Sequence, residues 1–512
     1  MKTISLIVLF LMTLPLSAQN IYTSAAPLQP QCIEMEGSQL FQRELRAGSW
    51  ADESDLMYGM DDSLRHNQYG DLRDDNPLYN EKSSVGMVAL RVTLSNVSTW
   101  AIDRYIFNYD FVRVSPETWQ YNIEHAPVWD SDRFGMNYFF HPFSGGMFYN
   151  AARANGFDFY ESIPFAYLGS LEWEYFGENT QPSYNDLINT PVNGVFFGEI
   201  LYRLGSNILD DNTTGWSRFL REAAVAIMTP TRFFSRLIKG DLGRVTSDQV
   251  YQQEPLNITL SGGYHRVNEG RSWEEGTNSM NVNLHLDYGN PFEKRTRKPY
   301  DFFRLRTDLD FGVGRKIIDN ITGYGVLVGR NVATANSDLF VGIFQHMNFF
   351  DNNTFELGTI GFGPSVMSKI PTSKKSSLYA NIHAALVPFG GLSGRWGPDT
   401  TQTRDYNYSG GAELKIEANH DVSGIFDLTL IAYYWALRTY VGTSESSYIA
   451  LIKPRITFHL FDNVSVGFEH LIYYSDRYPK NFPAVHSVRT EQKLFLSIFL
   501  EEFKFKRKGA AN

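Results

Sequence analysis

The sequence predicts an α+β protein in which a mostly helical N-terminal domain precedes a membrane β-barrel of about 12 antiparallel strands. Three observations predict this fold. The chain begins with a leader typical of exported proteins, a helical period of apolar residues runs through 83–240, and alternation of apolar and polar residues runs through 255–505. Together they indicate a protein of the outer membrane.

Residues 1–18 have the features of a secretory signal peptide. Lys2 is followed by the apolar run ISLIVLFLMTLPL and the small-residue exit LSA, so we expect the mature chain to begin near Gln19. A membrane anchor is the alternative, but the run is shorter than the roughly 20 residues that cross a bilayer. The single cysteine, Cys32, lies well beyond the cleavage point, which argues against lipidation and excludes an intramolecular disulfide.

Composition narrows the class of protein. The formal net charge is -10 and the longest basic run is FKFKRKG at the end of the chain, which excludes nucleic acid as a partner. Aromatic residues make up 15% of the chain, whereas the mean hydropathy is -0.28. After the leader, no uncharged window reaches the length of a membrane helix, so strands are the expected membrane spans.

Residues 19–82 are acidic and carry too few periodic apolar positions to build a core. We predict an extended periplasmic segment that acts as a tether. The alternative is a docking strip for a partner that uses Leu56, Met57 and Tyr58.

Residues 83–240 form the predicted helical domain. Ser115 followed by Pro116 marks a helix start, and a second helix begins at His141. The first segment of the domain, SVGMVALRVTLSNVSTWAIDRYIF, approximates a helical stripe, although its β-branched residues leave a strand open.

Residues 255–505 form the predicted barrel, followed by a tail at 506–512. In FFRLRTDLDFGVG the charged residues Arg304, Arg306, Asp308 and Asp310 share one face, which we assign to the lumen. Opposite charges there are expected to brace the barrel, and the alternatives are a permeation path or a ligand clasp. Long outer and short inner connections favour a barrel over a soluble β-sandwich, the other fold considered.

Several motifs of the helical domain resemble a known family. YNAARANG, GSLEWEYFGE, PSYNDLINT and GEILYRL are similar to a family from Bacteroidetes-type bacteria, domain of unknown function 3943. The resemblance implies a helical segment that precedes an outer-membrane barrel, and it implies no activity. It covers residues 83–239 closely and the barrel only by architecture, with Pro191 as a departure from a straight helix.

The stretch SYNDLINTPVNGVFFGE predicts a packing helix. Ser183 and Asp186 resemble a capping box at its start. Thr190, Gly194 and Gly198 lie along one ridge, where small residues allow a second backbone to approach. The proline at 191 predicts a kink, unless residue 190 caps a fresh helix.

Glu174 and Glu178 lie one turn apart just before this helix, so we expect a cation, proton or donor between them. The candidate partners are His141, Arg153 and Arg203. Glu199, on the packing helix, can also pair with Arg203 one turn away.

The candidate catalytic residues are His141, Glu174, Glu178, Ser183 and Asp186. A histidine with two or three carboxylates can perform acid–base hydrolysis or hold a divalent metal. The alternative is a solvated helix end or a buried network that fixes how the helices cross. No established catalytic or metal-ligand motif is present, so we assign no cofactor and no metal.

Three hypotheses of function follow. The first is an outer-membrane barrel whose helical domain lies in the periplasm or plugs the lower mouth, acting in transport or envelope maintenance. The second is a lipid- or glycolipid-modifying hydrolase that uses the His/Glu/Asp cluster. The third is a structural subunit of an envelope assembly. The expected partners are outer-membrane lipid and envelope proteins, and the sequence indicates no oligomeric state.

Overall fold

The computed structural model describes residues 75–501 with the exception of 269–275, 294–296, 314, 333, 335–336, 353, 355, 394–405, 423 and 462. The predicted leader, the acidic segment as far as residue 74 and the tail at 506–512 lie outside the described residues. The helices and the strands belong to one compact unit, Arg73–Asn512.

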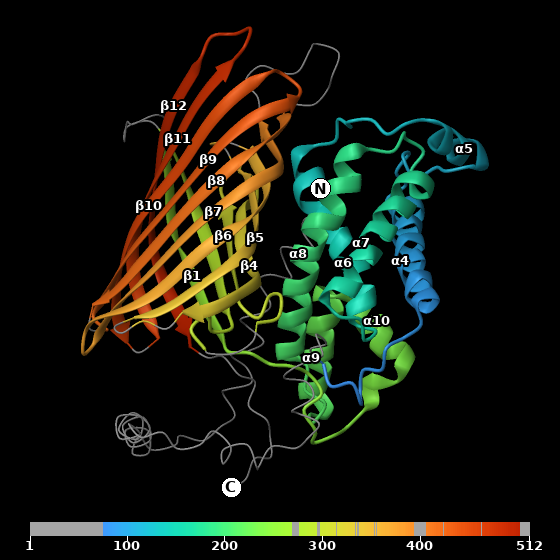
Figure 1. Ribbon diagram of the computed structural model, residues 1–512, viewed down its shortest axis with the longest axis horizontal. Helices are drawn as coiled ribbons and strands as arrows, with labels where there is room; N and C mark the ends of the chain where they lie inside the picture. Colours follow the sequence, from blue (N-terminus) through green and yellow to red (C-terminus); the bar gives the residue numbers. More distant parts are fainter. Residues whose placement is uncertain are drawn as a thin grey trace. The chain divides into compact units, whose positions relative to one another are not determined.

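Helices fill the first part of this unit (Figure 1). They are α4 (Val85–Tyr105), α5 (Pro116–Glu124), η1 (Met136–Phe140), α6 (His141–Arg153), α7 (Phe159–Glu172), η2 (Trp173–Gly177), α8 (Tyr184–Ile208), α9 (Gly215–Met228), α10 (Pro230–Lys239) and η3 (Asp241–Gly243). Side-chain caps begin several of them. Ser84 accepts a hydrogen bond from the amide of Met87, and Ser115 forms a capping box with Thr118.

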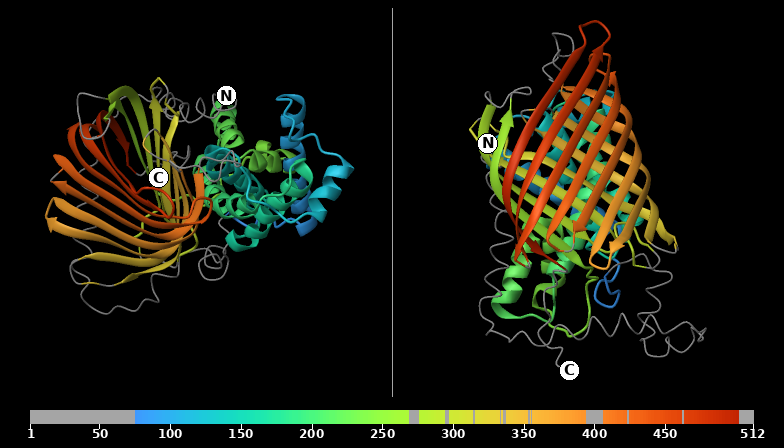
Figure 2. Two further views of the ribbon diagram at one scale, coloured as in Figure 1. Left: turned by 90° about the horizontal axis from the view of Figure 1, so that it is seen from above. Right: turned by 90° about the vertical axis from the view of Figure 1, so that its left-hand side faces the viewer.

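Twelve antiparallel strands form the second part. They are β1 (Leu256–Asn268), β2 (Gly276–Tyr288), β3 (Phe303–Phe311), β4 (Ile318–Val332), β5 (Asp338–Asp351), β6 (Glu356–Ser373), β7 (Ser376–Ser393), β8 (Tyr406–Val422), β9 (Phe426–Val441), β10 (Glu445–Phe461), β11 (Val464–Pro479) and β12 (Val485–Leu500). Each strand pairs with its sequence neighbours, and β1 pairs with β12 to close the barrel (Figure 2). The predicted fold class is confirmed.

Successive residues of the strands face opposite sides of the wall. On β10, Ile452 and Phe458 are 42% and 45% exposed, whereas Lys453 and Thr457 are buried. Apolar side chains therefore cover the exterior and polar side chains fill the interior, which is the arrangement of a barrel that sits in lipid. The chain is an outer-membrane β-barrel with an N-terminal helical domain.

Ion pairs cross the interior of the barrel. Arg304 on β3 reaches Glu417 on β8, with 2.6 Å between Nη1 and Oε2, and Arg306 also pairs with Glu417. These two strands are five steps apart in the ring of twelve, so the pair spans almost the full width of the lumen. Lys493 on β12 lies 3.0 Å from Asp308.

The remaining predicted lumen residue, Asp310, lies 2.9 Å from Nδ1 of His265 on β1. All four charged residues of β3 therefore contact oppositely charged or ionisable groups on other strands. The lumen is held together by charged side chains that reach across it.

The helices pack on the outer wall of the barrel. On β5, His346 and Asn348 turn toward Glu413 of β8 inside the barrel. Gln345 lies between these positions in the sequence of the strand, and its side chain therefore points to the opposite, outer face. Its Nε2 donates a hydrogen bond to the carbonyl oxygen of Val192 on α8 at 3.0 Å. The helices therefore lie beside the barrel wall. The predicted positions were the periplasm and the inside of the lower mouth of the barrel.

Helix α8 runs between the two ends of the barrel wall. Near its C-terminus, Asn207 donates to the carbonyl oxygen of Glu254, just before β1, at 2.9 Å. Near its N-terminus, Asn185 Oδ1 accepts a hydrogen bond at 3.1 Å from the amide of Asp130, which lies in the loop before η1. The carboxylate of Asp130 accepts from the hydroxyl of Tyr408, near the start of β8. At 25 residues the helix is about 37 Å long, comparable with the roughly 30 Å of a bilayer's hydrocarbon core.

Connection lengths indicate which end faces the cell exterior. The end that carries the start of β1 and the end of β12 has connections of two residues at 374–375 and 462–463, although the connection 289–302 is longer. The opposite end carries the connections 269–275 and 394–405. Short turns face the periplasm in such barrels, so α8 begins near the cell-surface end.

Glycines bring α6 and α8 into close contact. A Cβ added to Gly145 would lie 1.9 Å from the carbonyl oxygen of Thr190, and one added to Gly194 would lie 2.6 Å from the carbonyl carbon of Gly145. Gly146 and Gly198 meet in the same way, with 3.1 Å from the added Cβ to the backbone nitrogen. The ridge predicted on α8 therefore meets a Gly-Gly pair of α6. Pro191 lies inside the continuous helix α8, so no fresh helix begins there.

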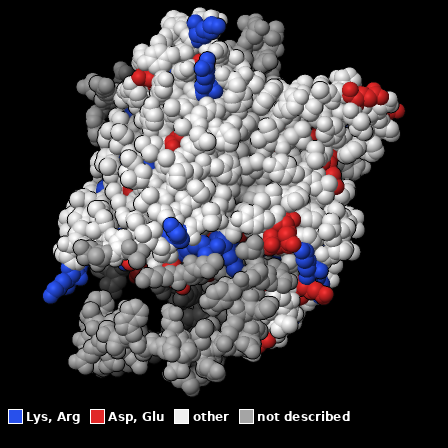
Figure 3. All heavy atoms as spheres, in the orientation of Figure 1, with Lys and Arg blue, Asp and Glu red and all other residues white. Residues whose placement is uncertain are grey.

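The exterior of the helical region resembles that of the barrel. Figure 3 shows that charged side chains are sparse over the middle of the drawn face, over barrel and helices alike. Among the described helices, α4 is long and apolar enough to cross a membrane by length and composition. Its Leu90 and Leu94 are 49% and 51% exposed. Apolar surface of this kind suits contact with lipid.

Candidate functional site

Three of the predicted site residues meet inside the helical domain. His141 begins α6, Glu174 lies in the π-helical turn η2, and Asp186 lies in the first turn of α8. One potential ligand atom from each lies within 4.8 Å of the others. The π-helical turn η1 directly precedes His141, and such turns frequently occur at functional sites.

Ser183 connects two of the carboxyl groups. Its hydroxyl caps α8 by accepting from the amide of Asp186, and it also hydrogen-bonds the Asp186 carboxyl. Its own amide donates to Oε2 of Glu174 at 2.7 Å. The residue therefore holds both carboxyl groups in place from the start of the helix.

His141 faces Asp186 across a gap. The distance from His141 Nε2 to Asp186 Oδ1 is 3.9 Å, which is too long for a hydrogen bond. Among the described residues, no N–H or O–H group donates a hydrogen bond to this carboxyl oxygen. The histidine side chain is 12% exposed and that of Asp186 is 4% exposed.

Glu178 lies at the edge of the cluster. Its carboxylate accepts from the indole of Trp173 at 2.6 Å and from the hydroxyl of Thr180 at 2.9 Å. Burial raises the pKa of Glu178 to about 7, against the opposing effect of these two hydrogen bonds. Trp173 and Thr180 are therefore the hydrogen-bond donors to Glu178.

Arg153 and Arg203 do not serve the two glutamates. Both pair with Glu199 on α8, at 2.8 Å in each case, and all three side chains are buried. Two of the three candidate partners of Glu174 and Glu178 thus pair with Glu199 instead, and the predicted pairing of Glu199 with Arg203 is confirmed. Arg203 lies one turn after Glu199 on α8, and Arg153 is the last residue of α6.

A residue that the sequence analysis missed, Asp130, completes the cluster. Its Oδ1 accepts from Asn137 Nδ2 at 2.9 Å and from the Tyr408 hydroxyl of β8 at 3.2 Å. Asn137 also donates to the Tyr406 hydroxyl at 2.6 Å. Asp130 lies in a loop without a motif, so only its neighbour Trp129 and the acidic context could have drawn attention to it.

Electrostatics in the cluster reflect buried like charges. Burial, followed by the charge of Glu178, raises the pKa of Glu174 well above its usual range. Burial, followed by the charge of Asp130, does the same to the pKa of Asp186. Burial lowers the pKa of His141, which favours the neutral imidazole. Several shifted pKa values in one buried cluster are typical of sites that exchange protons with a substrate.

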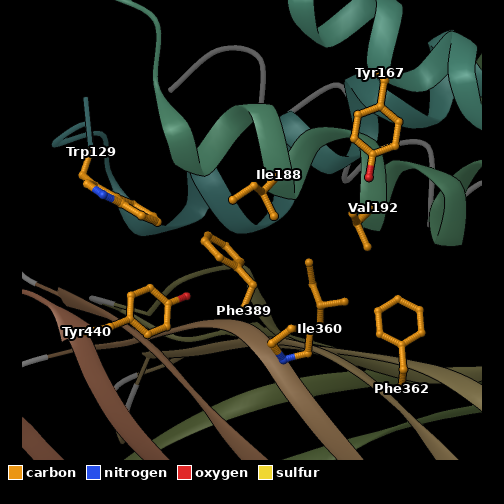
Figure 4. A pocket seen from close by; sticks show the side chains of 9 residues that line it. Trp129, Tyr167, Ile188, Val192, Ile360, Phe362, Phe389 and Tyr440 are labelled. Carbon is orange, nitrogen blue, oxygen red and sulfur yellow. The ribbon is translucent and has the colours of Figure 1, made fainter. Parts of the chain in front are cut away.

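An apolar crevice lies between the helices and the barrel wall (Figure 4). Its volume is about 600 Å³. It is lined by Trp129, Tyr167, Ile188, Val192, Ile360, Phe362, Pro388, Phe389 and Tyr440. Tyr167 and Ile188 are 42% and 39% exposed, so the crevice opens to the exterior of the molecule.

The crevice adjoins the cluster. Trp129 lines the crevice and directly precedes Asp130 in the chain. The ring of Trp129 lies 4.8 Å from that of Tyr408, whose hydroxyl donates to Asp130. The crevice and the cluster therefore share the loop that carries Trp129 and Asp130.

Residues 126–231 match the model of DUF3943, a domain of unknown function. The match begins just before Asp130 and ends in α10, so it contains every residue of the cluster that belongs to the helical domain. The strands lie beyond it. No curated protein matches the chain.

Solved structures of barrels show a weak likeness. The NanC porin is 10% identical, with a TM-score of 0.26, and the match covers 48% of this chain and 99% of that one. The outer membrane channel DcaP of Acinetobacter baumannii is 9% identical, with a TM-score of 0.23 and 48% and 97% of the two chains covered. An anion-selective porin from Comamonas acidovorans is 7% identical, with a TM-score of 0.23 and 48% and 99% covered.

Proposed function

We propose that this protein hydrolyses a lipid or glycolipid of the outer leaflet. The observation that carries the proposal is the apolar crevice beside the buried cluster of His141, Glu174, Asp186 and Asp130. The barrel exterior lies in lipid, so acyl chains surround the opening of this crevice. An acyl chain is therefore the occupant that we propose. The position near the cell-surface end favours a lipid of the outer leaflet.

The cluster offers the groups that ester hydrolysis needs. A water oxygen forms a bond to the ester carbonyl carbon, and the bond between that carbon and the alcohol oxygen breaks. The proton that the water loses passes through the cluster to the alcohol oxygen, so proton balance is kept. The carboxyl and imidazole groups of the cluster can accept this proton and return it.

Transport through the lumen has less support. The pairs from Arg304 and Arg306 to Glu417 and from Lys493 to Asp308 cross the interior and occupy it with buried side chains. A purely structural role in an envelope assembly would leave the crevice and the adjoining acid–base groups without a purpose.

The test uses full-length protein in vesicles of phospholipid and lipopolysaccharide, with released fatty acids measured by mass spectrometry. We expect product from the wild type and about a 100-fold slower release from Asp186→Asn, since general acid–base groups contribute that much or more. Glu124→Gln, an exposed carboxylate of α5, is the matched control and should behave as the wild type. Absence of product from folded wild-type protein, with both lipids present, refutes the proposal.

A further inference from the structure

We propose that His141, Glu174 and Asp186 hold one divalent transition-metal ion such as Zn²⁺. One nitrogen and two carboxylate oxygens from these residues lie within 4.8 Å of one another. No metal-ligand motif marks the site in the sequence, because the three ligands come from α6, η2 and α8.

The first argument is the state of Asp186. Its side chain is 4% exposed, and Oδ1 points toward Nε2 of His141 at 3.9 Å without a hydrogen bond from any N–H or O–H of the described residues. A second carboxyl group, that of Asp130, lies beside it. Two buried carboxyl groups that face one another need a shared proton or a cation between them.

The second argument is the contrast with the other buried acids of the helical domain. Glu199 is neutralised by two arginines, and Asp75 lies 3.1 Å from Arg232. Within the described part of the chain, neither Glu174 nor Asp186 forms an ion pair with a lysine or an arginine. The positive charge that balances Glu199 and Asp75 is therefore missing at these two.

The third argument is the geometry and chemistry of the donors. Zinc bonds of about 2.0–2.2 Å to two ligands in tetrahedral geometry place those ligands roughly 3–4 Å apart, close to the observed 3.9 Å. An imidazole with two carboxylates is a donor set that Zn²⁺ accepts, and it leaves a fourth position for water.

Hydrogen bonds around the donors orient them. Ser183 holds Oδ2 of Asp186 through its hydroxyl and Oε2 of Glu174 through its amide. This leaves the second oxygen of each carboxyl group available to an ion. Partners of this kind fix the direction of metal ligands in known sites.

The experiment measures binding without any lipid substrate, so it succeeds or fails independently of the proposed hydrolysis. Full-length protein in detergent is treated with EDTA, dialysed and titrated with ZnCl₂ and, separately, CaCl₂ by calorimetry, and bound metal is counted by mass spectrometry. We expect one zinc per chain and at least tenfold weaker binding in His141→Gln and Glu174→Gln. His486→Gln is the matched control, because this exposed histidine also faces a carboxylate, Asp476, at 2.6 Å.

A second measurement covers the case in which a variant fails to fold. The thermal midpoint of the wild type should rise when zinc is added, because an ion that binds only the folded state stabilises it. Loss of zinc in His486→Gln alone, equal binding in all variants, a preference for calcium, or a wild type that neither binds zinc nor is stabilised by it overturns the proposal. In the last case the carboxyl groups share a proton.

Discussion

The hydroxyl of Tyr408, near the start of β8, donates a hydrogen bond to Oδ1 of Asp130 at 3.2 Å. The barrel wall thus contributes directly to the buried cluster of the helical domain. Asp130 in turn faces Asp186, one of the carboxyl groups that meet His141. The site therefore depends on both parts of the molecule being joined.

Replacement of Tyr408 by Phe should weaken this junction. The change removes a donor from a buried carboxylate, which costs about 1–3 kcal/mol of folding free energy. Chemical denaturation of the detergent-solubilised protein measures the loss. Tyr448→Phe, at a half-exposed position on the lipid side of β10, is the control and should change stability little. Equal stability of both variants would show that the hydrogen bond is unimportant.

The contact between α6 and α8 should not tolerate a methyl group. Gly145→Ala places a Cβ 1.9 Å from the carbonyl oxygen of Thr190, so the helices must separate. We expect a loss of about 1–3 kcal/mol or more, as for overpacked cores. Gly86→Ala, in the first turn of α4 with no atom within 4 Å of the added Cβ, should be neutral or slightly stabilising. A comparable loss at both glycines would contradict the close contact.

The sequence predicted what depends on local periodicity. Alternation of side chains along each strand is a local property, so the barrel and the face that carries Arg304 and Asp308 could be predicted from the residue order. The cap at Ser183 involves Asp186, only three positions on, so it could also be predicted from the residue order. Contacts between residues far apart in the sequence leave no local pattern and could not be predicted in this way.

The position of the helices could not be predicted because two kinds of surface look alike. A strand residue that faces lipid and one that faces α8 are both small or apolar, as Ile452 and Ile360 illustrate. The cluster was predicted only in part for a similar reason. Asp130 and Tyr408 are separated by hundreds of residues, and neither belongs to a motif.

Glu199 should be essential for stability. It is fully buried between Arg153 and Arg203, so Glu199→Gln removes the carboxylate that both guanidinium groups share. Arg203 keeps Asp301 at 3.5 Å. Breaking a buried pair in this way typically costs about 3–5 kcal/mol. Denaturant unfolding compares it with Glu161→Gln, whose partner Lys82 is 42% exposed. The surface pair should contribute at most about 1 kcal/mol; a similar loss in both would contradict the expected difference.

The barrel should not conduct as an open pore. Charged side chains of β3 reach partners on β8 and β12 across the lumen. Purified protein in planar bilayers is expected to show no steady conductance at moderate voltage. The triple variant Arg304→Ser, Arg306→Ser and Glu417→Ser removes the pairs between β3 and β8, leaves the Lys493–Asp308 pair in place, and should produce conductance. Steady ion flow through the folded wild type would mean that a continuous path exists beside these pairs.

Filling the crevice should block the lipid without disturbing the fold. Ile188 lines the crevice and is 39% exposed, so a tryptophan there can occupy the apolar space while its far edge remains outside the core. We expect Ile188→Trp to release fatty acid at least tenfold more slowly than the wild type and to retain less co-purified lipid, with unchanged zinc binding. Ile123→Trp, at a 62% exposed position of α5, provides the same added volume away from the crevice. If both tryptophan variants turned over lipid like the wild type, the acyl chain would have to bind elsewhere, and the crevice would be only a gap between the two parts of the molecule.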